Sequence, residues 1–181
     1  GMGLQRPNTL ARMREIKAEG GWGVVCTEYC SIDPTSDDSS YPFARLWNKQ
    51  DIKAHAKTTE RIHKHNALAG VELWIGGNYV ANLDSRIPPL GISSRPLTNP
   101  DVYHPYQSKK LDKADIKNLR VLQKSAAKKA IEAGFDIVYV YATHGYLLSE
   151  FLDSKTNSRT DEYGGSIENR VRIVKELILE T

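Results

Sequence analysis

The sequence of 181 residues has only two cysteines, Cys26 and Cys30, too few for the disulfide framework of a small secreted domain. A C-x-x-x-C spacing without a second pair of ligands does not form a structural zinc site either, so both thiols are interpreted as semi-buried residues at a strand end. Unpaired thiols indicate a reducing, cytoplasmic location.

Long apolar runs and an excess of charge of one sign are also missing. No stretch of about 18 apolar residues occurs, so no membrane-spanning helix is expected. The sequence shows no charged-then-apolar leader, so secretion is not indicated. The net charge is +3, with 25 Lys and Arg residues scattered among 22 Asp and Glu residues. Nucleic-acid binders concentrate their basic residues on one face. The sequence therefore predicts neither a membrane nor a nucleic-acid partner.

The patterns that are present alternate between helix and strand. Apolar residues at helical spacing, N-cap residues and glycine stops predict four helices, and short runs rich in Val and Ile predict three strands. The three predicted strands are residues 22–29, 68–74 and 135–141. The first three predicted helices run from the cap Asn8 to the stop Gly20, over 49–66, and from Asp112 to Gly134. The fourth helix is capped by Ser166, and its predicted buried stripe is Ile167, Val171, Val174 and Leu177 or Ile178.

Strands that alternate with helices predict an α/β fold with a parallel sheet. The loops that follow strands are long, and the one before residue 112 contains five prolines that argue against any regular element: Pro88, Pro89, Pro96, Pro100 and Pro105. Long loops at the carboxyl ends of strands are typical of (β/α)₈ TIM barrels. A doubly wound sheet is the alternative, but no strand–helix turn carries the G-x-G-x-x-G motif of such folds.

Polar or aromatic side chains follow each predicted strand, and in a barrel these ends lie on one rim. Tyr29 ends the first strand, Glu72 lies near the end of the second, and Tyr141 and His144 follow the third. Tyrosine at a strand end usually reflects packing, but the repetition at three ends favours a binding site. Tyr141 and His144 offer hydrogen-bond donors to one ligand, Tyr29 offers an aromatic face to an alkylated ammonium, and Glu72 offers acceptors to a ring N–H.

The stretch NSRTDEYGGSIENR, residues 157 to 170, is interpreted from its residues alone as a loop locked by salt bridges. Together with THGYLLSEFL it resembles the Old Yellow Enzyme family of FMN-dependent (β/α)₈ barrels, whose pattern is H-G-Y-L-x-x-x-F-L and then N-x-R-x-D-x-Y-G-G-S-x-E-N-R. The matching positions are His144, Gly145, Tyr146, Leu147, Phe151, Leu152, Asn157, Arg159, Asp161, Tyr163, Gly164, Gly165, Ser166, Glu168, Asn169 and Arg170. The segments KAEGGWGVVCTEYCSIDPTSDD, HNALAGVELWIGG and AGFDIVYVYATHGYL resemble the amine dehydrogenase branch of that family.

The resemblance implies an FMN-dependent oxidative N-demethylation of a small alkylamine. It implies that Tyr29 belongs to an aromatic cage around the methylated nitrogen, that Tyr141 and His144 flank the flavin and substrate, and that Glu72 contacts the flavin pyrimidine ring. Ene-reductases of the same family, which usually have His where this chain has Tyr141, are the alternative. The residues themselves identify no metal ligand.

The resemblance also implies that residues 1–181 are a single partial barrel domain, truncated at both ends, with about strands two to four and helices one to four. A complete barrel needs about 250 residues. The FMN phosphate site, and an iron–sulfur cluster of the 4Fe-4S type if the parent has one, would lie in the missing C-terminal part. Alone, the chain is expected to be inactive and to self-associate through open sheet edges and an exposed face of Ile, Val and Leu. A non-catalytic half-barrel is the third possibility.

Overall fold

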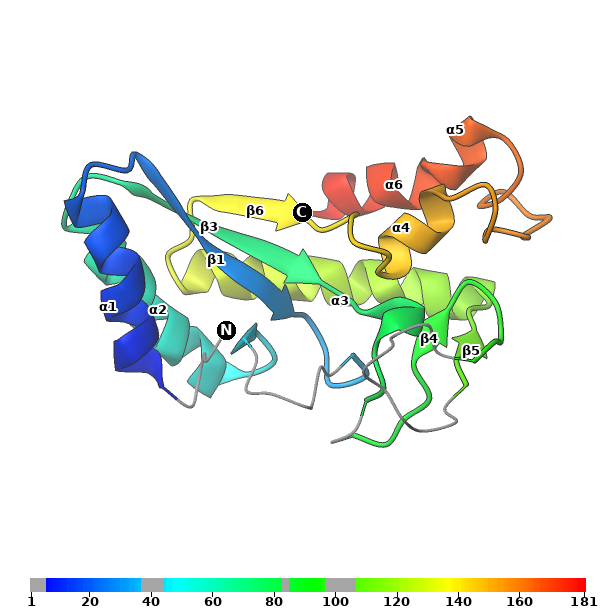
Figure 1. Ribbon diagram of the computed structural model, residues 1–181, viewed down its shortest axis with the longest axis horizontal. Coiled ribbons are helices and arrows are strands. Elements are labelled where there is room, and N and C mark those ends of the chain that lie inside the picture. Colours follow the sequence, from blue (N-terminus) through cyan, green and yellow to red (C-terminus); the bar gives the residue numbers. More distant parts are fainter. Residues whose placement is uncertain (1–5, 37–43, 83–84, 97–106) are drawn as a thin grey trace.

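The computed structural model describes residues 6–36, 44–82, 85–96 and 107–181. A sheet of four parallel strands, in the order β2-β1-β3-β6, runs through its middle (Figure 1). The strands of this sheet are β1 (Val24–Ser31), β2 (Ala44–Arg45), β3 (Leu68–Trp74) and β6 (Ile137–Val140). The α/β class and the parallel sheet predicted from the sequence are confirmed.

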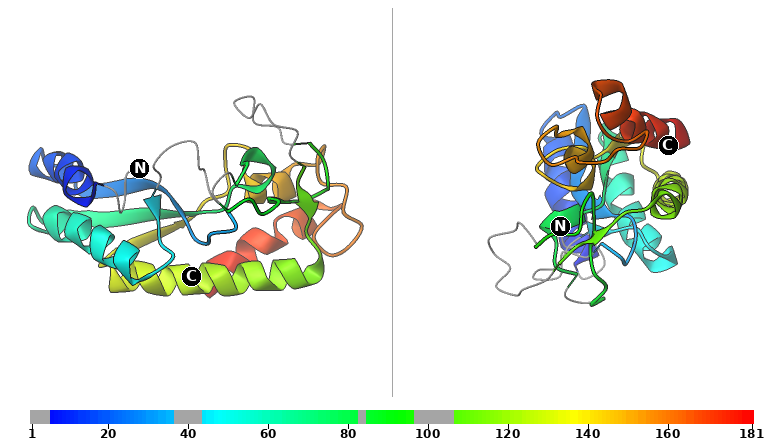
Figure 2. Two further views of the ribbon diagram at one scale, coloured as in Figure 1. Left: turned by 90° about the horizontal axis from the view of Figure 1, so that it is seen from below. Right: turned by 90° about the vertical axis from the view of Figure 1, so that its right-hand side faces the viewer.

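Helices alternate with the three longer strands. The helices are α1 (Pro7–Glu19), α2 (Lys49–His63), α3 (Lys113–Glu132), α4 (Leu147–Leu152), α5 (Ile167–Arg170) and α6 (Arg172–Glu180). Helix α1 packs against α2, and α6 packs against α3, which lies on one side of the sheet (Figure 2, left). In the described part of the chain, this arrangement covers one face of the sheet with helices and leaves the other face without one.

The two faces of the sheet differ in composition because side chains alternate along each strand. The helix-covered face is apolar: Val25, Val71 and Leu73 are at most 2% exposed and belong to the main hydrophobic core. The open face carries Glu72 and Tyr139 near its middle. The prediction that the exposed face consists of Ile, Val and Leu side chains is therefore mostly wrong, because most of these side chains point to the helices.

Several predicted boundaries need correction. Helix α1 begins at Pro7 rather than after Asn8, which agrees with the preference of proline for the first helical turn. Strand β1 extends to Ser31, two residues beyond the predicted strand. Helix α2 ends at His63 rather than near Asn66, which adopts a left-handed φ of 57°.

The last predicted helix is two helices, with a break at Val171. The Ser166 side chain accepts a hydrogen bond from the Asn169 N–H, so the predicted cap is confirmed. The predicted buried stripe is confirmed at Leu177, which is 1% exposed, and Val171 and Val174 are half-buried. It is wrong at Ile167, which is 55% exposed, and it missed Ile173, which is buried. The break interrupts the 3.6-residue repeat on which the stripe was based.

The proline-rich loop after β3 contains regular structure that the prolines seemed to exclude. It forms a 3₁₀ helix, η1 (Gly77–Tyr79), and two short parallel strands, β4 (Leu90–Gly91) and β5 (Lys109–Lys110). Proline is tolerated next to such strands because the Pro89 carbonyl still accepts a hydrogen bond, here from the Lys109 N–H. Pro100 and Pro105 lie outside the described residues.

The motif at residues 157–170 is a locked loop, as its charges predicted. The Arg159 guanidinium donates two hydrogen bonds to Asp161, at 3.0 and 2.6 Å, and a third to the Leu111 carbonyl at 2.6 Å. A Cβ atom at Gly164 would lie 2.1 Å from the Arg159 carbonyl oxygen, so only glycine fits there. The motif therefore fixes the connection between α4 and α5.

Candidate functional site

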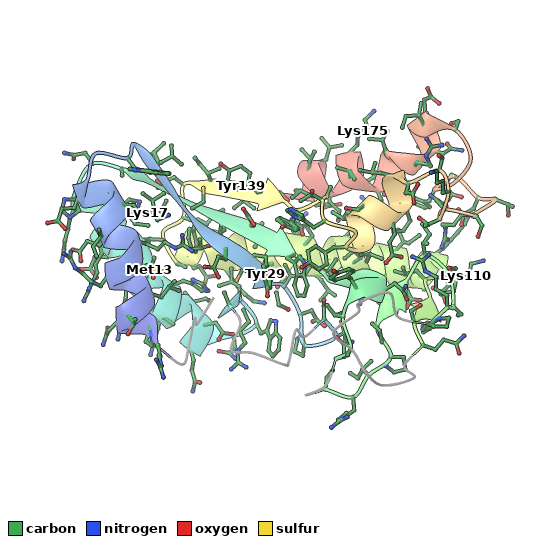
Figure 3. The ribbon with its side chains drawn as sticks, viewed as in Figure 1. Met13, Lys17, Tyr29, Lys110, Tyr139 and Lys175 are labelled. Carbon is green, nitrogen blue, oxygen red and sulfur yellow. The ribbon has the colours of Figure 1, made fainter. Side chains whose placement is uncertain are left out.

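The strand register places the predicted site residues on the open side of the sheet. Tyr29 pairs with Glu72, and Glu72 pairs with Tyr139 on the next strand. Figure 3 shows Tyr29 near the carboxyl end of β1 and Tyr139 on β6. Paired residues of parallel strands share a face, so Tyr29 and Glu72 belong to one surface. The predicted convergence of the strand ends is confirmed for these positions.

Tyr146 lies at the centre of an aromatic cluster at this end of the sheet. Its ring centroid lies 5.2 Å from that of Trp74, 5.4 Å from that of Tyr79, 5.8 Å from that of Tyr141 and 6.4 Å from that of Tyr29. The contacts with Trp74 and Tyr79 are edge-to-face, a favourable arrangement of aromatic quadrupoles. The rings of Tyr29 and Trp74 are 4.8 Å apart. Residues distant in the chain thus form one electron-rich wall.

Tyr141 and His144 form a hydrogen-bonded pair beside this wall. The phenol oxygen of Tyr141 lies 2.7 Å from Nδ1 of His144, and the two rings are stacked with centroids 5.8 Å apart. A tight turn makes this possible, because His144 has a φ of 56° and Gly145 has a φ of 76°. Both values lie in the left-handed region, which a histidine seldom adopts. The predicted proximity of the two side chains is confirmed.

Glu72 offers a carboxylate with unused acceptors next to this pair. Within the described residues it makes no hydrogen bond or ion pair, and it is half-buried. Burial raises the pKa of Glu72, and the nearby charge of Glu28 raises it further, while His144 and Arg14 oppose the shift. Such a group suits a ligand that brings an N–H donor.

Gly70 lets side chains from β1 and β6 meet across β3. Cys26 Sγ lies 3.6 Å from the phenol oxygen of Tyr139, and a Cβ atom at Gly70 would lie 2.6 Å from that sulfur. Both cysteines of the chain are free thiols. Burial raises the pKa of the Cys30 thiol. Cys30 is therefore an inert part of the core.

Sequence reasoning missed two members of the aromatic cluster. Tyr146 could have been found, because it follows His144 by two residues within the H-G-Y stretch. Tyr79 carries no such signal, because it lies in the proline-rich loop, where side chains follow no period. A pocket of about 290 Å³ beside Tyr79 is lined by Tyr79, Arg95, Ser149 and Glu150, among others.

The pKa of Tyr141 gives a first test of this geometry. Burial raises it above the ordinary value of 10.0, and the negative charge of Glu72 raises it further. Tyr141 therefore stays a neutral phenol at neutral pH and can donate a hydrogen bond to Nδ1 of His144. We expect Glu72→Gln to lower the pKa of Tyr141 part of the way toward 10.0, because the charge is lost while the burial remains.

The measurement is the alkaline absorbance titration of tyrosinate, with Tyr141→Phe used to assign the signal. Glu60→Gln, on an exposed position of α2, is the control for a general change in net charge. A titration of Tyr141 that responds equally to both carboxylate changes would contradict the proximity of Glu72.

Comparison with known proteins identifies the lineage of this fold. The model of the NADH:flavin oxidoreductase / NADH oxidase family matches residues 3–181. Dimethylamine dehydrogenase of Hyphomicrobium sp. (strain x) is 38% identical over 175 residues, which cover 95% of this chain and 24% of that protein. The structure of histamine dehydrogenase from Rhizobium sp. 4-9 matches with 40% identity and a TM-score of 0.92, over 96% of this chain and 27% of that chain.

A more distant match extends the comparison beyond amine enzymes. The Old Yellow Enzyme homologue from Zymomonas mobilis is 30% identical, with a TM-score of 0.82 over 93% of this chain and 49% of that chain. The chain thus spans about a quarter to a half of the length of these relatives. Its fold matches the N-terminal part of Old Yellow Enzyme TIM barrels. By the match over nearly its whole length, the chain belongs to the NADH:flavin oxidoreductase / NADH oxidase family.

Proposed function

We propose that this chain forms the substrate-facing part of an FMN-dependent amine dehydrogenase that resembles trimethylamine dehydrogenase. The reaction is the oxidative N-demethylation of a small alkylamine, and the chain alone is inactive. The similarity to dimethylamine dehydrogenase and histamine dehydrogenase supports the amine branch. The observation that carries the proposal is the aromatic wall around Tyr146, with the Tyr141–His144 pair beside it.

Tyr29 recognises the alkylated nitrogen in this proposal. A trialkylammonium presents mostly methyl groups and a diffuse positive charge, which an aromatic face attracts by about 0.5–2 kcal/mol. A primary ammonium instead needs several acceptors to replace the water that it loses on binding. The close packing of Tyr29 against Trp74 holds the tyrosine ring in place and favours the alkylated cation.

The residues present fit the ring system of FMN. The unused acceptors of Glu72 suit the pyrimidine N–H of the flavin, and Trp74 Nε1 is a buried donor without a hydrogen-bond partner in the described part of the chain. When bound, FMN accepts the two electrons released as the C–H bond next to nitrogen is broken. We assign the phosphate site and any 4Fe-4S cluster to parts of the parent protein beyond this chain.

Tyr141 and His144 take the catalytic positions beside the flavin and the substrate. The raised pKa of Tyr141, caused first by burial, keeps its phenol neutral, so that it can donate a hydrogen bond to His144. The neutral phenol of Tyr141 does not repel a cationic amine, and the stacked rings of Tyr141 and His144 shield the reacting carbon from water. The chain thus binds, orients and shields the amine.

The direct test is turnover by the full-length protein that contains this chain. We expect the purified protein to show the visible absorbance of bound FMN and to oxidise trimethylamine or dimethylamine with an artificial electron acceptor. The competing activity, an ene-reductase, is supported by the similarity to the Zymomonas mobilis homologue. NADPH-driven reduction of an enone without amine oxidation would establish that alternative and overturn the proposal.

A third possibility is a non-catalytic, self-associating half-barrel, which a colourless parent protein without flavin would favour. The two free thiols support our proposal of a cytoplasmic location. In the described residues, no helix is both long and apolar enough to cross a membrane.

A further inference from the structure

We propose that Glu150 is a positioning residue that sets the aromatic wall by joining the loop of Tyr79 to the helix that follows Tyr146. This inference rests on the proposed amine site, since it concerns the wall of that site. Glu150 lies on α4 and does not touch the proposed substrate position itself. Its role is to hold Tyr79 and Tyr146 in their relative positions.

The Glu150 carboxylate ties together three segments of the chain. Its Oε1 atom accepts a hydrogen bond from the Asn78 N–H at 2.7 Å, and its Oε2 atom accepts one from the Ile92 N–H at 3.1 Å. The side chain is 4% exposed. A single carboxylate on α4 therefore holds both η1 and the residue that follows β4.

The electrostatic environment of Glu150 indicates that its carboxylate is held by backbone N–H groups. Burial raises the pKa of Glu150, and the two backbone N–H groups and Arg95 oppose the shift. The nearest Arg95 nitrogen is 3.8 Å away, so the two backbone donors are the close partners of the carboxylate. Burying a carboxylate is unfavourable unless hydrogen bonds replace its hydration, and here both oxygens are used.

The loop and the helix lie too close together to admit a side chain at Gly77. A Cβ atom at Gly77 would lie 2.7 Å from the backbone of Leu147 and 2.9 Å from Glu150 Oε1. Gly77 has a φ of 65°, which favours glycine. The backbone of η1 thus lies directly against the start of α4.

This contact determines the packing of the aromatic wall. Tyr79 follows Asn78, whose N–H binds Glu150, and Tyr146 immediately precedes α4. Their rings meet edge-to-face with centroids 5.4 Å apart. Glu150 fixes the backbone on both sides of that contact, and through Tyr146 it influences the rings of Tyr29 and Tyr141.

Asp51 offers a matched control in another part of the fold. It is 1% exposed, and its Oδ2 atom accepts hydrogen bonds from the Trp47 N–H at 2.9 Å and the Asn48 N–H at 3.2 Å. It lies in the first turn of α2 and belongs to none of the aromatic contacts. Its Oδ1 atom also pairs with the Arg45 guanidinium at 3.1 Å. Asp51→Asn therefore removes a buried carboxylate and this ion pair without acting on the wall.

The experiment compares Glu150→Gln with Asp51→Asn in the flavin-loaded full-length protein. Glutamine has one acceptor oxygen, so its NH2 group must face either the Asn78 or the Ile92 N–H. We expect Glu150→Gln to raise KM for trimethylamine by roughly three- to tenfold and to change kcat less than about twofold, because a displaced wall weakens substrate positioning. Asp51→Asn should leave KM unchanged while lowering the melting temperature.

Hydrogen exchange of peptides 76–82 and 143–150 provides a readout independent of activity. Both peptides should exchange faster in Glu150→Gln, and neither should do so in Asp51→Asn. Unchanged exchange in both peptides would overturn the positioning role, and so would an equal rise in KM for the two variants. If the wild-type protein oxidises no amine, the proposed function fails, whereas the exchange comparison still decides the role of Glu150.

Discussion

Tyr29→Gln in the full-length protein is expected to weaken trimethylamine binding by roughly 2- to 30-fold. The range corresponds to the loss of a cation–π contact of about 0.5–2 kcal/mol. The new amide brings an acceptor oxygen, so amines that keep an N–H should lose less affinity than the tertiary amine. The ratio of kcat/KM for dimethylamine to that for trimethylamine should therefore increase.

Tyr29→Phe is the matched control, because it keeps the aromatic face and its packing against Trp74 and removes only the hydroxyl group. Steady-state kinetics with both amines on the three proteins would decide the role of Tyr29. If the glutamine and phenylalanine variants change the two amines by the same factor, Tyr29 does not recognise the alkylated nitrogen.

The isolated chain is expected to self-associate and to show no amine turnover. Strand β6 forms one edge of the sheet, and β2 covers only the end of the other edge, at Cys30 and Ser31. Unpaired edge groups favour pairing with another chain. The open face adds Val24 and Leu68, which are 40% and 47% exposed. A second copy can satisfy both the edge and this small apolar area.

Light scattering at micromolar concentration measures the association, and a single monomeric species would contradict it. Tyr139→Lys tests the edge, because Tyr139 is 43% exposed on β6 and a charged edge residue opposes strand pairing. Leu179→Lys is the control on α6, where the leucine is 85% exposed. Dissociation by the Leu179 change alone would assign the contact to the helices. Flavin-dependent amine oxidation by the isolated chain would contradict the second half of the prediction.

The sequence was most informative where local signals and tertiary structure agree. The parallel sheet follows from strands that alternate with capped helices, and the capping boxes at Asn48 and Asp112 give α2 and α3 clear starts. Tyr29, Glu72 and Tyr141 could be grouped because each lies at or near the end of a strand. Parallel pairing then brings the strand ends to one rim of the sheet.

Other features depend on contacts between distant segments and leave no periodic signal. Glu150 accepts hydrogen bonds from Ile92 and Asn78, which lie 58 and 72 positions before it in the chain. Tyr79 follows Asn78, whose N–H binds Glu150, and we propose that this contact holds Tyr79 in the aromatic wall. The buried stripe of the last helix was predicted correctly at Leu177 but not at Ile167, because the break at Val171 interrupts the helical repeat.

The lock formed by Arg159 and Asp161 has a consequence for how related proteins can be sorted. The longest family match in the chain serves to hold a loop, with Gly164 confined by the Arg159 backbone. Such a motif should persist in enzymes of very different substrate preference, because it maintains architecture that all of them need. A sequence search based on this motif would identify family members correctly and would not distinguish them by the reaction that they catalyse. In the function that we propose, the single position after the strand that Tyr141 occupies carries more information about the substrate than the whole motif.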